Sequence, residues 1–301
     1  MKDHGSEQRS MPPAVAVWKA RVLSFLKELG IVLGAFLVLN NFVIASFMVP
    51  TGSMENEVMT GDFLFVNKFI YGGTSPRNIP FTNVRLPWFR VPAIRDVHHG
   101  DVIVFVFPGY RDEVMPEDFQ FYLKRCVGIP GDTIQVKERV LYVNGEIAPL
   151  PRNLKLSPSP PLPPDLVNDQ IFPPGAPWNE DNYGPLVIPK KGMAIPISAE
   201  NFDRWKTFIR REGHAARLTA DGVQVDGKTT TEYVVERDYY FGMGDNRNNS
   251  LDSRFWGFIP DENIVGSPII VYWSWDSDIP LSSIFQRLAS VRLNRIGVLI
   301  K

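Results

Sequence analysis

Residues 121–130 read FYLKRCVGIP and have the alternating pattern of a β-strand. In an extended segment, successive side chains point to opposite faces. Lys124 then shares a face with Tyr122 and Cys126, whereas Arg125 lies on the other face. The stretch therefore predicts a strand that presents two neighbouring cations in opposite directions.

Further blocks of β-branched and aromatic residues lie between glycines and prolines, as is typical of strands. They are residues 61–71 (GDFLFVNKFIY), 100–108 (GDVIVFVFP), 233–260 and 264–275 (IVGSPIIVYWSW). Gly-Asp pairs, a common turn chemistry, recur at residues 61–62, 100–101, 131–132 and 244–245. The 301 residues, among them 26 Pro and 23 Gly, are predicted to be mainly β, with an antiparallel sheet as the main domain.

An uncharged apolar stretch precedes these strands. Residues 29–50 read LGIVLGAFLVLNNFVIASFMVP, and Asn40 and Asn41 are their only strongly polar members. At about 1.5 Å per residue, a helix of this length crosses a hydrocarbon core of roughly 30 Å. The stretch predicts a single retained transmembrane helix. The alternatives are a cleaved secretory signal, whose apolar core is about 7 to 15 residues long, and a buried core helix.

Basic residues before the apolar stretch indicate its orientation. They are Lys19, Arg21 and Lys27. Under the positive-inside rule, residues 1–28 form a cytoplasmic tail and the domain after Ser53 lies on the outer side of the cell membrane. We therefore expect a single-pass protein of the inner or plasma membrane.

The chain after the apolar stretch divides into two parts by composition. Residues 51–148 and 233–301 are predicted to form the main β-domain, and residues 149–232 an inserted, smaller, β-rich second domain. Asn144-Gly145 is a type I′ hairpin signal, and residues 156–164 (LSPSPPLPP) form a proline-rich linker.

Two local predictions concern segments at the edges of these domains. Within the insert, Ser198 is expected to cap a short helix over residues 199–211. Residues 74–95, which are rich in proline and aromatic residues, are expected to form a loop or extended hairpin near the membrane.

Composition also excludes several classes of protein. The 32 Lys and Arg nearly balance the 33 Asp and Glu, so no overall charge favours nucleic acid as a partner. Cys126 is the only cysteine, which excludes an intrachain disulfide and a multi-cysteine zinc site. The four histidines lack a metal-binding spacing such as HExxH. We therefore expect no metal, no cofactor and no nucleic-acid partner.

A serine without a histidine partner needs another base, and a lysine kept neutral is one such base. Lys124 lies in an otherwise apolar strand, where burial lowers the pKa of a lysine by up to several units. The alternative is an edge-strand lysine that discourages aggregation, or one whose ammonium reaches solvent. The alternating pattern alone leaves both interpretations open.

Four segments together resemble, in order, the sequence boxes of the type I (leader) signal peptidases of bacteria. They are residues 50–54 (PTGSM), 61–72 (GDFLFVNKFIYG), 124–132 (KRCVGIPGD) and 244–260 (GDNRNNSLDSRFWGFIP). The resemblance covers roughly residues 45–145 and 233–275. It implies a membrane-anchored serine endopeptidase that removes N-terminal signal peptides from exported preproteins after small-x-small sites. Its partners would be preprotein signal peptides and membrane lipid.

By position in these boxes, the resemblance implies a Ser-Lys dyad. Ser53 would be the nucleophile and Lys124 the general base. The oxyanion would be held by the Ser53 backbone N–H and the hydroxyl of Thr51, although Thr51 also fits a simple turn residue.

Other positions would have supporting roles by the same resemblance. Ser250 matches the position that orients the lysine amine, or it is a turn residue. A salt-bridge cluster around the dyad would consist of Asp252, Arg254 and Arg125. The residues that would line substrate pockets, or else fill the core, are Met54, Phe63, Phe65 and Val127.

One residue departs from the family pattern. Asn56 stands where the box after the nucleophile has proline, so the rigidity of this loop is in doubt. Two other functions remain open from the sequence: a self-cleaving repressor-type Ser-Lys protease, and a non-catalytic membrane-tethered β-domain that binds partners.

Overall fold

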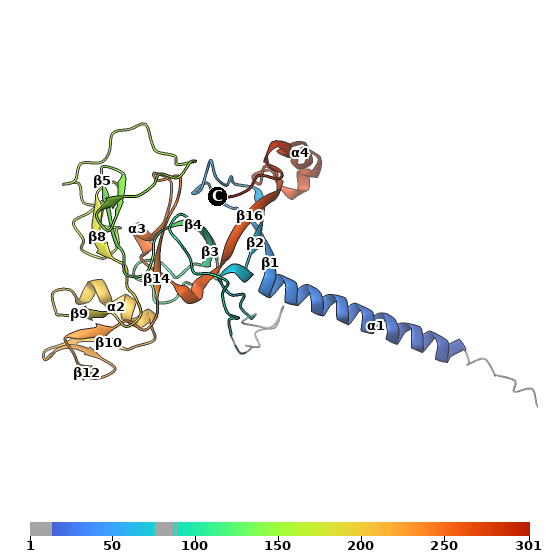
Figure 1. Ribbon diagram of the computed structural model, residues 1–301, viewed down its shortest axis with the longest axis horizontal. Helices are drawn as coiled ribbons and strands as arrows, with labels where there is room; N and C mark the ends of the chain where they lie inside the picture. Colours follow the sequence, from blue (N-terminus) through green and yellow to red (C-terminus); the bar gives the residue numbers. More distant parts are fainter. Residues whose placement is uncertain (1–13, 76–86, 88) are drawn as a thin grey trace, which may run out of the picture.

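The structure is a computed structural model that describes residues 14–75, 87 and 89–301 (Figure 1). Its first element is the helix α1 (Ala14–Val38), which continues through a π-helical turn, Leu39–Val43. The segment Trp18–Val43 is long and apolar enough to cross a membrane, and its apolar window is not buried in the protein. In Figure 1, α1 projects away from the rest of the molecule.

The predicted helix over residues 29–50 is wrong at both ends. The helix begins earlier, and the residues Ile44–Met48 form the strand β1. All five residues of β1 pair with β2 (Asp62–Asn67). An apolar strand that directly follows an apolar helix leaves no break in the hydropathy, so the junction is not visible in the sequence.

The main sheet has seven strands in the order β1-β2-β16-β3-β4-β14-β15, and its pairs are antiparallel. The strands not yet defined are β3 (Val102–Val106), β4 (Phe121–Gly128), β14 (Tyr239–Met243), β15 (Ile259–Pro260) and β16 (Ile264–Ser274). The mainly β prediction is confirmed. The long strand β16 joins the two halves, because it pairs with β2 on one side and β3 on the other.

The two faces of β3 belong to two different apolar clusters. Ile103 and Phe105 pack in a cluster with Trp256. Val102 and Val104 pack in a second cluster that contains Met54, Val58, Leu64 and Val66, and we call it the Met54 cluster. The sheet is therefore buried on both sides, which explains why β3 is apolar at successive positions.

The second part of the molecule lies on the side of the main sheet remote from α1 (Figure 1). Its first sheet has the order β7-β6-β5-β8. These strands are β5 (Thr133–Lys137), β6 (Val140–Val143), β7 (Glu146–Ile147) and β8 (Tyr183–Val187). The sheet pairing therefore places the start of the second part near residue 133, earlier than the expected 149. The hairpin at Asn144-Gly145 is confirmed, since both residues have positive φ, 53° and 85°.

The rest of the second part consists of short strands around one helix. The strands are β9 (Ala194–Pro196), β10 (Ala216–Thr219), β11 (Gly222–Val225), β12 (Lys228–Thr229) and β13 (Glu232–Val234). The helix α2 spans Phe202–Arg211, with Asn201 at its N-cap position. The predicted Ser198 cap is wrong: the backbone N–H of Ser198 donates to Asn201 Oδ1, which closes a turn before the helix.

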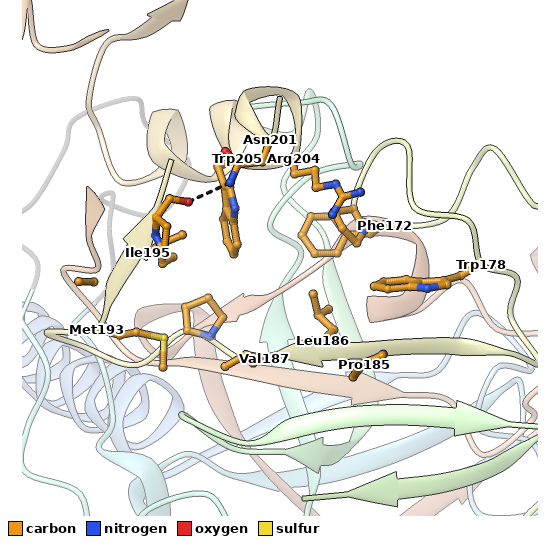
Figure 2. Close-up of a pocket in the computed structure, with 14 residues that line it drawn as sticks. Phe172, Trp178, Pro185, Leu186, Val187, Met193, Ile195, Asn201, Arg204 and Trp205 are labelled. Carbon is orange, nitrogen blue, oxygen red and sulfur yellow. Dashed lines mark hydrogen bonds between the residues drawn. The ribbon is translucent and has the colours of Figure 1, made fainter. Parts of the chain in front are cut away.

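A cavity of about 370 Å³ lies within this second part, between β8 and α2 (Figure 2). Half of its lining residues are aromatic residues and prolines, among them Phe172, Trp178, Pro185 and Trp205. All the lining residues lie between residues 172 and 205, so this cavity belongs to the insert.

The remaining helices are short. They are α3 (Ser253–Trp256), α4 (Ile284–Ala289) and the 3₁₀ turns Phe69–Tyr71, Asp261–Asn263, Leu281–Ser283 and Leu293–Arg295. Of the loop predicted over residues 74–95, residues 76–86 and 88 lie outside the described part of the chain.

Gly266 of β16 tests the role of this strand in joining the two halves of the sheet. A Cβ at this position would lie 2.3 Å from the carbonyl oxygen of Asn67, a backbone atom that cannot turn aside. We expect Gly266→Ala to lower the free energy of unfolding by about 1–3 kcal/mol, measured by urea denaturation in detergent. Gly34→Ala is the control, because a Cβ there meets nothing within 4 Å. Equal stability of the two variants would contradict this role of β16.

Candidate active site

Ser53 lies in a closed loop between β1 and β2. Two backbone hydrogen bonds join the ends of this loop, from Val49 N to Asp62 O and from Gly61 N to Val49 O, both 2.9 Å. Inside it, Glu55 N donates to Gly52 O at 3.0 Å, which forms a turn around Ser53. We call residues 49–62 the serine loop.

Lys124 of β4 meets Ser53 directly. Its Nζ lies 2.8 Å from Ser53 Oγ, although the two residues are 71 positions apart. The same Nζ is 3.1 Å from the carbonyl oxygen of Leu123. The Lys124 side chain is buried, with a relative exposure of 3%. The structure therefore brings together the two residues that the sequence analysis singled out for a dyad.

Burial lowers the pKa of Lys124 from its ordinary value of 10.5 to about 8. Three smaller effects partly oppose one another: the Asp252 and Asp245 carboxylates raise this pKa and the Arg254 guanidinium lowers it. Within the described residues, no carboxylate forms an ion pair with Lys124. A lysine with this pKa is partly neutral near physiological pH, as a general base requires.

The donors expected around an oxyanion are free of partners in the described part of the chain. The backbone N–H of Ser53 makes no hydrogen bond there, whereas its carbonyl accepts from Asn246 N at 3.1 Å. Thr51 is exposed, and its hydroxyl has no partner among the described residues.

Ser250 lies against the serine loop but does not reach Lys124 with a hydrogen bond. Its buried Oγ has no partner among the described residues. A Cβ on Gly244 would lie 2.2 Å from Ser250 Oγ and 2.5 Å from Ser53 O, so both groups pack closely against Gly244. The structure places Ser250 beside the dyad without showing it to orient the amine.

The expected salt-bridge cluster consists of two separate groups: Asp252 with Arg254, and Arg125 with Asp245 and, at 3.9 Å, Glu57. Asp252 accepts from Arg254 Nε at 2.9 Å and Nη2 at 2.8 Å, and both side chains are almost completely buried. Arg125 instead donates to Asp245, at 2.8 Å and 2.6 Å. Asp245 is a member that the sequence analysis missed, because the Gly-Asp pair at 244–245 was interpreted only as turn chemistry.

The expected substrate-pocket residues do not gather in one place. Met54 is buried in the Met54 cluster, next to Ser53 in the chain. Phe63 and Phe65 lie on the opposite face of β2 from Leu64, and both contact Tyr272. Val127 belongs to the core of the second part. Phe63 and Phe65 therefore point away from the Met54 cluster, and Val127 belongs to a different core, so the assignment of these three residues to substrate pockets stays a prediction.

The Met54 cluster contains further apolar residues that the sequence analysis did not assign to the site. They are Val49, Val58, Leu64, Val104 and, partly buried, Phe47 and Leu123. The signal for them was the alternation of β2, where Leu64 and Val66 share a face that Phe63 and Phe65 do not.

The sequence matches the family of signal peptidases, peptidase S26, over residues 22–273. It is 32% identical over 257 residues to a signal peptidase I of Pseudomonas aeruginosa, covering 81% of this chain and 70% of that protein. It is 31% identical over 283 residues to a signal peptidase I of Pseudomonas fluorescens, covering 88% and 79%.

Among solved structures, a signal peptidase I of Enterococcus faecalis is similar, with 20% identity and a TM-score of 0.25, over 58% of this chain and 98% of that one. The family match covers most of the chain, and it includes Ser53, Lys124 and the two buried ion pairs. The chain belongs to the signal peptidase family, peptidase S26, and is a membrane-anchored serine endopeptidase that removes signal peptides.

Proposed function

We propose that Ser53 and Lys124 form the catalytic dyad of this peptidase. The observation that carries the proposal is the 2.8 Å contact between Lys124 Nζ and Ser53 Oγ, made by a buried lysine whose pKa is lowered to about 8. A neutral Nζ accepts the proton of the Ser53 hydroxyl as Oγ attacks the scissile carbonyl carbon. The resulting ammonium then donates that proton to the nitrogen of the leaving amine.

The second half of the reaction uses the same two groups. The acyl group is held as an ester on Ser53 Oγ after the amine departs. Lys124, neutral again, accepts a proton from a water molecule that attacks the ester carbonyl. The proton returns to Ser53 Oγ as the acid product leaves, so the enzyme is regenerated.

Two donors would bind the oxyanion of both tetrahedral intermediates. The Ser53 N–H has no other partner in the described residues, and the Thr51 hydroxyl is two residues away and exposed. Such donors stabilise a transition state because they bind the negative charge that develops there.

Two strand edges that lack a neighbouring strand among the described residues are the proposed binding site for an extended substrate peptide. β1 pairs with β2 on one side only. β14 pairs with β4 from Arg125 onward, so within the described residues one edge of Phe121–Lys124 is also free. The rings of Phe47 on β1 and Phe121 on β4 lie 4.9 Å apart between centroids, which brings these two edges together. An extended peptide bonded to such edges would be directed to Ser53.

The same geometry accounts for selection of small side chains. In an extended peptide, the residue at the scissile bond and the residue two places before it point to the same face. That face would be the Met54 cluster, where Val49, Met54 and Leu64 are already close-packed. Only small side chains fit such a surface, which is consistent with cleavage after small-x-small sites.

The membrane topology completes the proposal. Lys19, Arg21 and Lys27 lie at the α1 end remote from β1, so the N-terminal end of the helix faces the cytoplasm under the positive-inside rule. Ser53 follows the helix by ten residues from Val43. The dyad would then lie on the extracytoplasmic side, where the end of a preprotein signal helix emerges.

Removal of either dyad residue should abolish cleavage of a purified preprotein. We expect Ser53→Ala and Lys124→Ala each to lower kcat by about 10³-fold or more. The double variant should be no worse than either single one, because the two residues act as a unit. Lys68→Ala is the matched control, since Lys68 is also buried with a lowered pKa. Normal processing by Ser53→Ala would rule out the dyad.

The pH dependence of the rate should report the Lys124 amine. The base is active when neutral, so kcat/KM should fall about tenfold per pH unit below a pKa near 8 and reach a plateau above it. KM measured at each pH separates substrate binding from the chemical step. An essential group titrating near pH 10 would show that the lysine is not depressed.

Gly244 should be required for the approach of Ser250 to the serine loop. We expect Gly244→Ala to lower kcat by about 100-fold, since its Cβ would displace the Ser53 backbone. The displacement should leave the fold intact by circular dichroism. Gly34→Ala again serves as the control, and an unchanged kcat in Gly244→Ala would mean that the serine loop moves freely.

A further inference from the structure

The serine loop contains a backbone conformation that proline cannot adopt. Asn56, three residues after Ser53, has φ = 81°. Proline is restricted to φ near −65°, so this loop differs in shape from one with proline at that position. The rigidity that proline would supply must come from contacts with other parts of the chain.

Residues 292–301, which we call the C-terminal segment, supply such contacts. Arg292 Nη2 donates to Thr60 O at 2.6 Å. Arg295 Nη2 donates to Glu57 O at 3.0 Å and to the Asp62 carboxylate at 2.6 Å. These bonds reach three positions on the far side of the serine loop from Ser53.

The end of the C-terminal segment connects the serine loop to the strand of the lysine. Lys301 N donates to Glu57 Oε1 at 2.8 Å. Lys301 O accepts from Arg125 Nη1 at 2.9 Å, and Arg125 is the neighbour of Lys124. One backbone position therefore bridges the two elements whose side chains form the dyad.

The C-terminal segment is itself held in place. It lies along β16, with hydrogen bonds from Val271 N to Val298 O at 2.9 Å and from Ile300 N to Ile269 O at 3.0 Å. Val298 and Ile300 pack against the Met54 cluster, beneath Met54 and Val58 of the serine loop. A segment that is hydrogen-bonded to a strand and packed against an apolar cluster can hold a loop rigidly.

A buried ion pair strengthens the contact between the C-terminal segment and the serine loop. Asp62 is completely buried, and two cations lie beside it: Arg295 donates to it at 2.6 Å, and Arg292 Nη2 is 4.0 Å from Asp62 Oδ1. Ser274 Oγ and Met59 N donate to the same carboxylate. Because a buried carboxylate without a cation is strongly unfavourable, Arg295 is kept against the loop.

We propose that the C-terminal segment is a positioning element that holds the serine loop, and with it Ser53, at contact distance from Lys124. The segment lies outside residues 22–273, over which the chain matches the family. The inference rests on the proposed role of Ser53 as nucleophile. It assigns Arg292 and Arg295 a function in catalysis through geometry, without contact with substrate.

The test compares Arg292→Ala with Arg287→Ala in the full-length protein. Arg287 is a buried arginine of α4 whose Cζ lies 4.5 Å from the centre of the Trp275 ring, and within the described residues it makes no hydrogen bond or ion pair with the serine loop. With a purified preprotein, Arg292→Ala should lower kcat at least tenfold, with KM within twofold of wild type. Its thermal midpoint should match that of Arg287→Ala. A kcat loss no larger than that of Arg287→Ala, or an effect confined to KM, would overturn the proposal.

Arg295 provides a second, independent comparison. Arg295→Ala should lower kcat, and Arg295→Lys, which keeps a cation opposite Asp62, should recover a substantial part of it. If Arg295→Ala does not fold, the comparison of Arg295→Lys with wild type remains, and a normal kcat in both Arg295→Lys and Arg292→Ala overturns the proposal. Ser53→Ala in the same assay separates the two hypotheses. An active Ser53→Ala refutes the proposed dyad, whereas an inactive Ser53→Ala with a fully active Arg292→Ala refutes only the positioning role.

Discussion

The burial of one amine without a carboxylate partner is the constraint on which the site depends. The Lys124 amine must be shielded from water if its pKa is to fall toward neutral pH. A carboxylate in an ion pair with the amine would raise that pKa again. The nearest acid that influences it, Asp252, already forms two hydrogen bonds with Arg254. The amine therefore contacts two neutral oxygens, the Ser53 hydroxyl and the Leu123 carbonyl, and the nearby charged residues pair with one another.

The two buried ion pairs follow from this constraint. A buried pair adds little stability compared with apolar residues, but loss of one partner leaves an uncompensated charge. Here the two ion pairs fix the position of a loop. Arg125–Asp245 joins β4 to the polar loop after β14, and Asp252–Arg254 begins α3 within that loop. The loop that contains Gly244 and Ser250 is therefore held against the back of the dyad.

The sequence was informative where local pattern and tertiary environment agree. The strands at 102–106, 121–128 and 264–274 were predicted because each is apolar on at least one face and bounded by turn residues. Ser53 and Lys124 were identified from their boxes, and alternation separated Lys124 from Arg125. These features depend on short segments only.

The errors arise where the environment is set by distant segments. The end of α1 was misplaced because strand pairing, not hydropathy, ends the helix at β1. The positions of Phe63 and Phe65 relative to the Met54 cluster could not be predicted, because the sequence does not say which face of β2 meets Met54. Asp245 was missed because its partner is 120 residues away. The contacts of residues 292–301 with the serine loop likewise leave no local pattern.

The direct passage from membrane helix to sheet has a mechanical consequence. The π-helical turn ends at Val43 and β1 begins at Ile44, so no linker separates the apolar helix from the main sheet. A strand of five residues extends about 16 Å at roughly 3.3 Å per residue. Because all five residues of β1 pair with β2, the sheet fixes the length of this segment. The distance between the end of the apolar helix and Ser53 is therefore set by the folded protein and not by a flexible linker.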